Sequence, residues 1–422
     1  MNIEKAQIFG LFLAHHRKER GLSFENIAKI AHCSISTVRN YENGVQLPEP
    51  HLQTEIARFF GYTKFIDNFQ NLDTYRSILN RIESLMYHQK KDEVMKIIHQ
   101  IYQNHENWIS SYAFLLFHLV VLMEERYVKK DEQQFLNLIK LLSKGVLFYT
   151  PFEKYIFYEF QGDFFYQNEK YDKALSFWVK AEQFQPQLPR IHIQLAMIYQ
   201  ILGYQILSLQ QLEIAKTLIF QNPDTYRFLQ VCLIEFTYKI DEIESYYSIY
   251  DTRSNLYQAC VDAGKIELSY LVLSNIAYMY LLNKDYVNSI AFSRKVLNSN
   301  DAPLLNILWF IPYSYLKMGL KSDCLLFIET YRDSAKKSSY ILNMLELIKE
   351  FCLGNRKKGI QNLERLIDCI DKKQDIEKKI FLLEWMIEEL QENQDFQRAF
   401  LFEKEVNALY LRRSSLICNE LG

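Results

Sequence analysis

Hydrophobic residues recur along the chain with the spacing of α-helices, and polar residues fill the positions between them. In the stretch from Ile3 to Glu19, Ile8 and Phe12 lie on one face, and Gly21 follows where a helix would end. The helical period continues from Leu72 to the C-terminus with breaks at roughly 30- to 40-residue intervals. No long alternation typical of a β-strand occurs. The pattern predicts an all-α protein.

Three shorter helices are predicted in the rest of the first 63 residues. Ser23 and Ser34 are good N-caps for the second and the third, because a serine hydroxyl accepts a hydrogen bond from an unpaired amide of the first turn. Gly44 would end the third helix, over 35–43, and Gly61 a fourth helix over about 52–60. The apolar residues of this segment predict a small core made of Leu13, Leu22, Ile27, Ala28, Val38, Leu52 and Ile56.

The composition favours helices over sheets. The 422 residues include 12 Gly and 8 Pro, well below the average shares of about 7% and 5%. A chain with so few turn-forming residues cannot make the many tight turns of a sandwich, a barrel or a propeller. The net charge of −2 excludes attraction to nucleic acid by bulk charge, but it does not exclude a local nucleic-acid site.

Cysteines and apolar runs indicate the compartment. The seven cysteines are scattered and form no CxxC pair, so we expect reduced thiols and neither a disulfide framework nor a zinc site. The N-terminal residues lack the order of a secretory signal. The richest apolar run, residues 112–123, contains His118 and is too short to span a bilayer. These features predict a soluble, cytoplasmic protein with no membrane partner.

The run GLSFENIAKIAHCSISTVRNYENG resembles the helix-turn-helix of the XRE and Cro family of repressors. The residues that match the family pattern are Gly21, Leu22, Ile27, Ala28, Ser34, Val38, Tyr41, Glu42, Asn43 and Gly44. The resemblance implies a helix-turn-helix DNA-binding domain over residues 1–63 and a structural ion pair between Arg17 and Glu42. Two positions depart from the pattern: Phe24 replaces a Gln that anchors phosphate, and His32 replaces the Gly of the tight turn, where His tolerates the left-handed conformation better than most residues.

In this family the second helix of the motif enters the major groove and presents its N-terminal side chains to base edges. The resemblance therefore implies that Ile35, Ser36 and Asn40 face bases, with Thr37, Arg39 and Asn43 near phosphates or flanking bases. Ile35 could contact a thymine methyl, and Asn40 could read adenine through two hydrogen bonds. The alternative is that these are exposed polar residues of a protein-interaction module.

The charge of this module indicates its assembly. Residues 1–63 carry seven Lys or Arg and six Asp or Glu, a balance of +1. Phosphate neutralisation supplies most of the non-specific affinity for DNA, so one such module should bind weakly. Two modules that read two half-sites would compensate. We therefore expect a homodimer bound to a double-stranded DNA operator.

Residues 155–188 resemble the tetratricopeptide repeat, a helical hairpin of about 34 residues. The matching residues are Tyr158, Gly162, Phe165, Ala174, Trp178, Ala181 and Pro186, and Gln161 departs where Leu is usual. Weaker units follow at 192–223, 273–303, 308–327, 341–363 and 381–402. One hairpin cannot bury its own apolar face, so hairpins must stack. We expect a right-handed helical superhelix over residues 75–422 for ligand binding and dimerisation, after a linker at 64–74.

Stacked hairpins of this kind form a concave groove that can hold a peptide. The inward positions of the repeat fall on Arg190, Gln194, Arg227, Gln230, Asn275, Tyr278, Asn306 and Tyr313. Asn275 stands where peptide-binding members of the family hold a ligand's backbone, since an amide both donates and accepts hydrogen bonds. Arg190 or Arg227 could bind a terminal carboxylate. For each residue, a role at the rim or between repeats is the alternative.

Catalytic signatures are absent from the sequence. It contains no P-loop, GxSxG, HExxH or GxGxxG motif, and the histidines, His15, His16 and His118 among them, lack the spacing of a ligand set. We therefore expect a protein that is not an enzyme, with no cofactor and no metal ion.

A DNA-reading module joined to helical repeats resembles the quorum-sensing PlcR, PrgX, Rgg and ComR group. The resemblance implies a homodimeric transcription regulator whose repeats bind a short signalling peptide that modulates operator binding. One alternative is a regulator whose repeats bind a protein partner or only dimerise. Another alternative is a repeat scaffold that does not bind DNA. The replacement of the phosphate-anchoring Gln by Phe24 favours this alternative.

Overall fold

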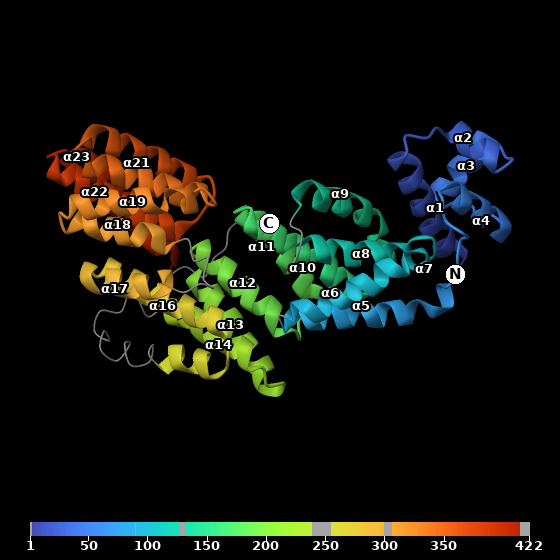
Figure 1. Cartoon of the computed structure of the whole chain (residues 1–422), viewed down its shortest axis with the longest axis horizontal. Coiled ribbons are helices and arrows are strands. Elements are labelled where there is room, and N and C mark those ends of the chain that lie inside the picture. The colour runs from blue at the N-terminus through green and yellow to red at the C-terminus, as the bar shows by residue number, and fades with distance from the viewer. Residues whose placement is uncertain (1, 89, 127–130, 239–254, 299–305, 414–422) are drawn as a thin grey trace. The chain divides into compact units, whose positions relative to one another are not determined.

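The computed structural model describes residues 2–88, 90–126, 131–238, 255–298 and 306–413 of the chain (Figure 1). Within these ranges every regular element is a helix, and one isolated bridge pairs Ile66 with Ser111. The prediction of an all-α protein is confirmed. Of the helices in the described ranges, none is both long and apolar enough to cross a membrane.

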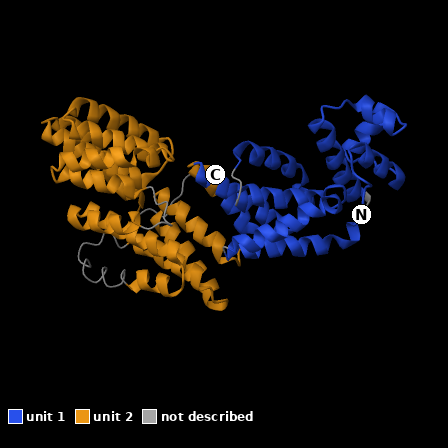
Figure 2. Cartoon of the chain, in the orientation of Figure 1, with its two compact units in different colours: residues 1–168, 176–185 blue, residues 169–175, 186–422 orange. Residues whose placement is uncertain are grey.

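The helices form two compact units, residues 1–168 with 176–185 and residues 169–175 with 186–422 (Figure 2). Helix α11 (Tyr171–Phe184) therefore supplies residues to both. The other α-helices of the first unit are α1 (Asn2–Glu19), α2 (Phe24–Ile30), α3 (Ile35–Glu42), α4 (Pro50–Phe59), α5 (Leu72–Tyr87), α6 (Lys91–Gln103), α7 (His105–Ile109), α8 (Phe114–Glu124), α9 (Glu132–Leu142) and α10 (Pro151–Gln167). The second unit contains α12 (Pro189–Ile201), α13 (Gln205–Gln221), α14 (Thr225–Tyr238), α16 (Ile266–Leu282), α17 (Tyr286–Leu297), α18 (Ile307–Lys317), α19 (Lys321–Ala335), α20 (Ser339–Cys352), α21 (Arg356–Asp371), α22 (Ile376–Glu392) and α23 (Phe396–Arg413).

Helices α1, α2 and α3 begin within one residue of their predicted starts, whereas α4 begins at Pro50, two residues before its predicted start. Ser23 caps α2 in a capping box with Asn26, and the Ser34 hydroxyl accepts a hydrogen bond from the Thr37 amide at the start of α3. Helix α1 is followed by Gly21 at φ 62°, and α3 by Gly44 at φ 69°. His32 has φ 46°, so the turn between α2 and α3 does use the left-handed conformation that the family usually gives to Gly.

The segment expected to be a linker, residues 64–74, packs against the rest of the first unit. The Ile66 amide donates to the Ser110 carbonyl over 2.9 Å, and Phe65 is buried. Residues 69–71 form a 3₁₀ turn (Phe69–Asn71) that leads directly into α5. The division into a DNA-binding domain at 1–63 and a repeat domain at 75–422 therefore remains a prediction about function, since one compact unit includes residues from both.

Helices α10 and α11 form the hairpin predicted around Gly162. A Cβ atom at Gly162 would lie 2.3 Å from Cδ1 of Trp178, so only glycine allows the indole to sit against this helix. Trp178 is almost fully buried, as is Ala174. Gln161, at the departing position, is buried as well and satisfies its amide by donating to the Phe157 carbonyl over 3.0 Å.

The second unit continues as successive packed helices. Helices α12 and α13 pack together, as do α16 with α17, α18 with α19, α20 with α21 and α22 with α23. Cys260, from the helix at 255–262, shares a small core with Leu229 of α14. A larger core runs from α16 to α23 and includes Trp309, Trp385 and Phe381. Pro303, expected to end the unit that begins at 273, lies outside the described residues.

The described cysteines, which exclude Cys418, are all free thiols. Cys260, Cys324 and Cys352 are buried, whereas Cys369 is exposed. Three of the six described cysteines are therefore buried, and the expectation of reduced thiols stays a prediction.

We predict that Gly162→Ala destabilises the protein. In an ordinary helix this change would stabilise by about 1 kcal/mol, because alanine is the better helix former. Here the added methyl would overlap the Trp178 indole, and overpacking a core costs about 1 to 3 kcal/mol. Calorimetric melting should show a lower unfolding temperature. In a Trp178→Ala background the same change should cost little or stabilise, and an equal cost in both backgrounds would contradict the steric explanation.

Candidate functional site

Helix α3 has one buried and one exposed face. Val38 and Tyr41 are buried and hold the helix against the rest of the domain. The residues expected at bases or phosphates lie on the other face: Ile35, Ser36, Arg39, Asn40 and Asn43 are exposed and Thr37 is half-buried. Ile35, the first residue of α3, is 38% exposed. The arrangement leaves these side chains accessible to a partner.

Arg17 and Glu42 form a two-pronged ion pair. Arg17 Nε donates to Glu42 Oε2 over 2.6 Å and Nη2 donates to Oε1 over 2.7 Å, while Nη1 donates to the Leu22 carbonyl over 3.0 Å. Both side chains are largely buried, with 11% and 9% exposed. The hydrogen bonds to Glu42 raise the pKa of Arg17. The pair therefore joins α1 to the C-terminal end of α3.

Phe24 packs against two guanidinium groups. Its ring centroid lies 4.1 Å from Cζ of Arg17 and 5.3 Å from Cζ of Arg39. Each such cation–π contact is worth about 0.5 to 1 kcal/mol at a partly exposed site. The residue that replaces the phosphate-anchoring Gln of the family therefore supports the ion pair and holds Arg39 of α3.

Two glycines let α1 cross the end of α3 closely. A Cβ at Gly10 would lie 2.6 Å from the Tyr41 carbonyl oxygen, and a Cβ at Gly44 would lie 2.6 Å from Cγ of Gln7. The sequence analysis assigned no role to Gly10. Glycine inside a helix is unfavourable unless a close contact requires it. The role of Gly10 could therefore have been identified only by predicting that α1 contacts α3.

The residues expected to hold a peptide lie on α12, α14 and α16 and at or within α18. Arg190 and Gln194 are on α12, Arg227 and Gln230 on α14, Asn275 and Tyr278 on α16, Tyr313 on α18, and Asn306 at the N-cap of α18. The structure brings Arg227 and Gln230 together: Arg227 Nη1 donates to Gln230 Oε1 over 2.6 Å.

Tyr278 and Tyr313 belong to an aromatic cluster with Phe381 of α22. Their ring centroids lie 6.4 Å and 5.3 Å from that of Phe381. Tyr313 is only 5% exposed, and burial raises the pKa of both phenols. Asn275 is half-buried and Asn306 is exposed. The expected set thus combines accessible amides with tyrosines that are part of the core.

Helices α22 and α23 contact α12 within the second unit. Gln200 of α12 donates to Glu377 of α22 over 3.3 Å, and Arg412 of α23 donates to the Tyr204 hydroxyl over 2.8 Å. A Cβ at Gly203 would lie 2.7 Å from Cδ1 of Ile376. Helices far apart in the sequence are therefore held together by polar and close apolar contacts, which the repeat pattern did not predict.

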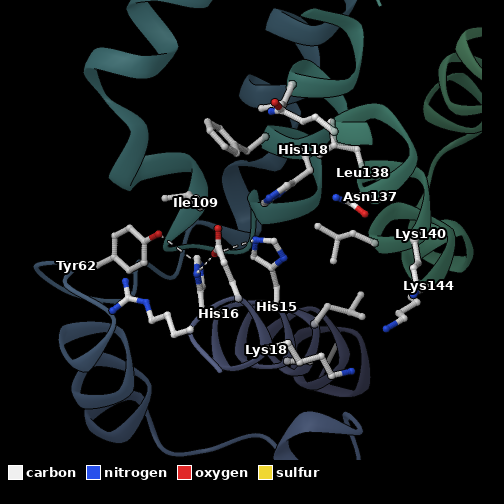
Figure 3. Close-up of a pocket in the computed structure, with 18 of the residues that line it drawn as sticks. His15, His16, Lys18, Tyr62, Ile109, His118, Asn137, Leu138, Lys140 and Lys144 are labelled. Carbon is white, nitrogen blue, oxygen red and sulfur yellow. Dashed lines mark hydrogen bonds and ion pairs between the residues drawn. The ribbon is translucent and has the colours of Figure 1, made fainter. Parts of the chain in front are cut away.

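A cavity in the first unit, of about 1140 Å³, is lined by residues of α1, α7, α8 and α9. Figure 3 shows that His15, His16 and His118 gather at this cavity, with Tyr62 beside His16. Burial lowers the pKa of His16 and of His118 to about 3, so both imidazoles are neutral at physiological pH. The sequence analysis set these histidines aside because they lack the spacing of a ligand set. The spacing of His15 and Glu19, one helical turn apart, was the available signal.

Comparison with known proteins supports both parts of the chain. Residues 8–64 match a family model described as a helix-turn-helix domain. A comparison with curated proteins finds no sequence match. The described fold is similar to the crystal structure of a Rap protein complexed with competence and sporulation factor, with a TM-score of 0.70 and 14% identity over 81% of this chain and 99% of that one.

Two further structures share the fold. NprR in complex with its cognate peptide NprX has a TM-score of 0.60 and 13% identity, over 76% of this chain and 99% of that one. Aspartyl phosphate phosphatase F from Bacillus subtilis has a TM-score of 0.51 and 16% identity, over 81% and 94%. The chain therefore combines an N-terminal helix-turn-helix domain with a helical-repeat fold like that of Rap and NprR, as the sequence predicts.

We predict that Glu42→Gln loosens α1 and α3. The change leaves the largely buried Arg17 without its carboxylate, and breaking a buried ion pair costs several kcal/mol; for this partly buried pair we expect about 2 to 4 kcal/mol. Hydrogen-exchange mass spectrometry should show faster exchange in peptides from residues 1–63. Lys18→Ala, which removes an exposed cation from the same helix, serves as the control and should leave exchange unchanged. Equal exchange in Glu42→Gln and the wild type would contradict a structural role for the pair.

Proposed function

We propose that the chain is a DNA-binding transcription regulator that acts in the cytoplasm and reads its operator with α3. The observation that carries the proposal is the exposed polar face of α3, which belongs to a domain that matches a helix-turn-helix model over residues 8–64. Ile35, Ser36 and Asn40 would contact base edges, and Thr37, Arg39 and Asn43 would contact phosphates or flanking bases. The Arg17–Glu42 pair and Phe24 would hold α3 in position for this contact.

The charge of the domain supports binding as a homodimer. Among its seven cations, Arg17 is engaged with Glu42, and Lys5 lies 2.7 Å from Asp67. One domain can therefore neutralise only a few phosphates, and the electrostatic share of its affinity is small. Two copies on one operator would add their contacts, because linking two binding modules raises the effective concentration of the second.

We further propose that the repeats bind a short signalling peptide that modulates operator binding. The fold is similar to that of NprR complexed with the peptide NprX and of a Rap protein complexed with competence and sporulation factor. The proposed contacts are Arg190, Gln194, Arg227, Gln230, Asn275, Tyr278, Asn306 and Tyr313. An accessible Asn275 amide would hold the peptide backbone, and Arg190 or Arg227 would bind its carboxylate.

The coupling between peptide and DNA requires only a modest difference in affinity. A tenfold effect of peptide on operator binding corresponds to about 1.4 kcal/mol of linkage. Tyr278 and Tyr313 pack against Phe381, so a ligand that displaces either tyrosine would also disturb α22 and its contact with Gln200 of α12. The proposed role is regulation by binding, in contrast to the aspartyl phosphate phosphatase among the similar structures.

We predict that the full chain binds duplex DNA from the region upstream of its own gene and that Arg39→Ala with Asn40→Ala weakens specific binding. Loss of one good base contact costs about 1 to 3 kcal/mol, so the double variant should bind specific DNA at least about tenfold more weakly in a gel-shift assay. The matched control is Arg81→Ala, which removes an exposed arginine from α5. A double variant that binds as well as the control would overturn the assignment of α3, and a wild type with no DNA affinity would favour the scaffold.

We predict that Asn275→Ala weakens binding of the cognate peptide by about tenfold or more. Short peptides encoded beside the gene would be titrated into the full chain by calorimetry. The amide's paired donor and acceptor contacts are each worth about 0.5 to 1.5 kcal/mol. The control is Asn298→Ala at the end of α17, an exposed asparagine that is outside the proposed set. Unchanged peptide affinity in Asn275→Ala would show that the peptide binds elsewhere. Binding of a protein but of no peptide would favour the alternative in which the repeats bind a protein partner.

A further inference from the structure

One turn of α1 brings together three side chains that commonly bind metal ions. Nε2 of His15 and Nδ1 of His16 each lie 3.5 Å from the same carboxylate oxygen, Oε2 of Glu19. The three atoms are all within 4.8 Å of one another. His15 is partly exposed, His16 is buried and Glu19 is 61% exposed, so an ion could reach the cluster from the solvent side.

The spacing of these atoms fits a tetrahedral ion. Zinc binds histidine nitrogen and carboxylate oxygen at about 2.0 to 2.2 Å, which separates two ligands of a tetrahedron by about 3.3 to 3.6 Å. The two 3.5 Å separations fall in this range. They are also longer than the 2.7 to 3.2 Å of an ordinary N–H···O hydrogen bond, so a direct bond does not account for them well.

The neighbours of His16 and His118 determine which ring nitrogen of each side chain can accept. Nε2 of His16 lies 3.4 Å from the Tyr62 hydroxyl, and a proton on this nitrogen leaves Nδ1 to face Glu19. Nδ1 of His118 lies 2.8 Å from the Phe114 carbonyl and donates to it, which leaves Nε2 as an acceptor. A carbonyl or hydroxyl on the second ring nitrogen is the usual support of a metal-binding histidine.

His118 comes from α8 and lies next to the cluster. It is 5% exposed, and its ring centroid is 5.0 Å from that of His15 in an edge-to-face arrangement. Figure 3 shows His118 on the opposite wall of the cavity from His15 and His16. His118 is not among the atoms that lie within 4.8 Å of one another, so its side chain would move towards the cluster to act as a fourth ligand from another helix of the same unit.

We propose that His15, His16 and Glu19 bind a divalent transition-metal ion of the Zn²⁺ class, with His118 as the fourth ligand. Two or three imidazole nitrogens select such an ion over Mg²⁺ and Ca²⁺, which prefer oxygen ligands. The cations that line the cavity, Lys18, Arg20, Lys140 and Lys144, disfavour ions held by charge alone and make the nitrogen bonds decisive.

A bound ion would join the helix-turn-helix domain to the repeat helices. The first three ligands lie on α1, which packs against α3, and His118 lies on α8. An ion that binds only the folded arrangement stabilises it by RT ln(1 + c/Kd), where c is the ion concentration, so the stabilisation grows with the logarithm of that concentration. The inference concerns this junction alone and does not depend on peptide binding or on DNA binding.

The test is titration of the full chain, after removal of any affinity tag, with Zn²⁺ against a competing chelator dye, and with Co²⁺ followed by its visible absorption. We expect one ion per chain and a Co²⁺ spectrum typical of four-coordinate geometry. Glu19→Gln and His15→Ala should each weaken Zn²⁺ binding by about tenfold or more, and His118→Ala should weaken binding and change the Co²⁺ spectrum. Zn²⁺ should also raise the unfolding temperature of the wild type but not that of Glu19→Gln.

Matched controls separate this site from adventitious binding. His99→Ala and His105→Ala remove exposed histidines elsewhere in the first unit and should leave affinity unchanged. Glu19→Gln alters an exposed side chain, so it keeps the test valid if a variant of the buried His16 fails to fold. Zn²⁺ affinity that is the same in the wild type, Glu19→Gln and His15→Ala would overturn the proposal, as would binding that is lost only when cysteines are replaced. An unchanged Co²⁺ spectrum in His118→Ala would overturn the assignment of the fourth ligand.

Discussion

The packing of α1 on two sides is the constraint on which the first unit depends. Towards α3, Gly10 allows close approach and Arg17 pairs with Glu42. Towards the repeat helices, the ring of Phe12 lies 5.3 Å from Phe65 and 5.8 Å from Phe114 of α8. Phe12 is fully buried, and burying such a side chain is worth about 1.5 to 3 kcal/mol. One helix therefore fixes the position of α3 relative to α8, and it also carries His15 and His16, which line the cavity that α1 and α8 share.

Local rules were sufficient to predict the helices and much of the candidate DNA-reading face. The caps at Ser23 and Ser34, the left-handed turn at His32 and the close approach at Gly162 all follow from residues within one hairpin, where the chain itself limits the alternatives. The exposure of Asn40 follows equally from its place opposite Val38 on a short helix.

The remaining features depend on contacts between residues distant in the chain. The cluster of His15 and His16 with His118 requires α8 to pack on α1, and the burial of Tyr313 requires α22 to pack on α18. Helical periodicity identifies which face of a helix is buried but not which helix covers it. For the same reason the stacking of Phe24 on Arg39 was not predicted: the sequence showed only that a family residue was missing.

The packed segment at 64–68 changes how a signal could reach α3. A flexible linker would let the helix-turn-helix domain reorient freely, whereas here Phe65 is buried and the Ile66 amide is bonded to the Ser110 carbonyl. Packed cores switch between discrete arrangements more readily than they deform continuously. A ligand that acts on α3 would therefore have to move it together with α1 and α8 as one body, or separate α1 from α8 at the cost of exposing Phe12 and the histidines.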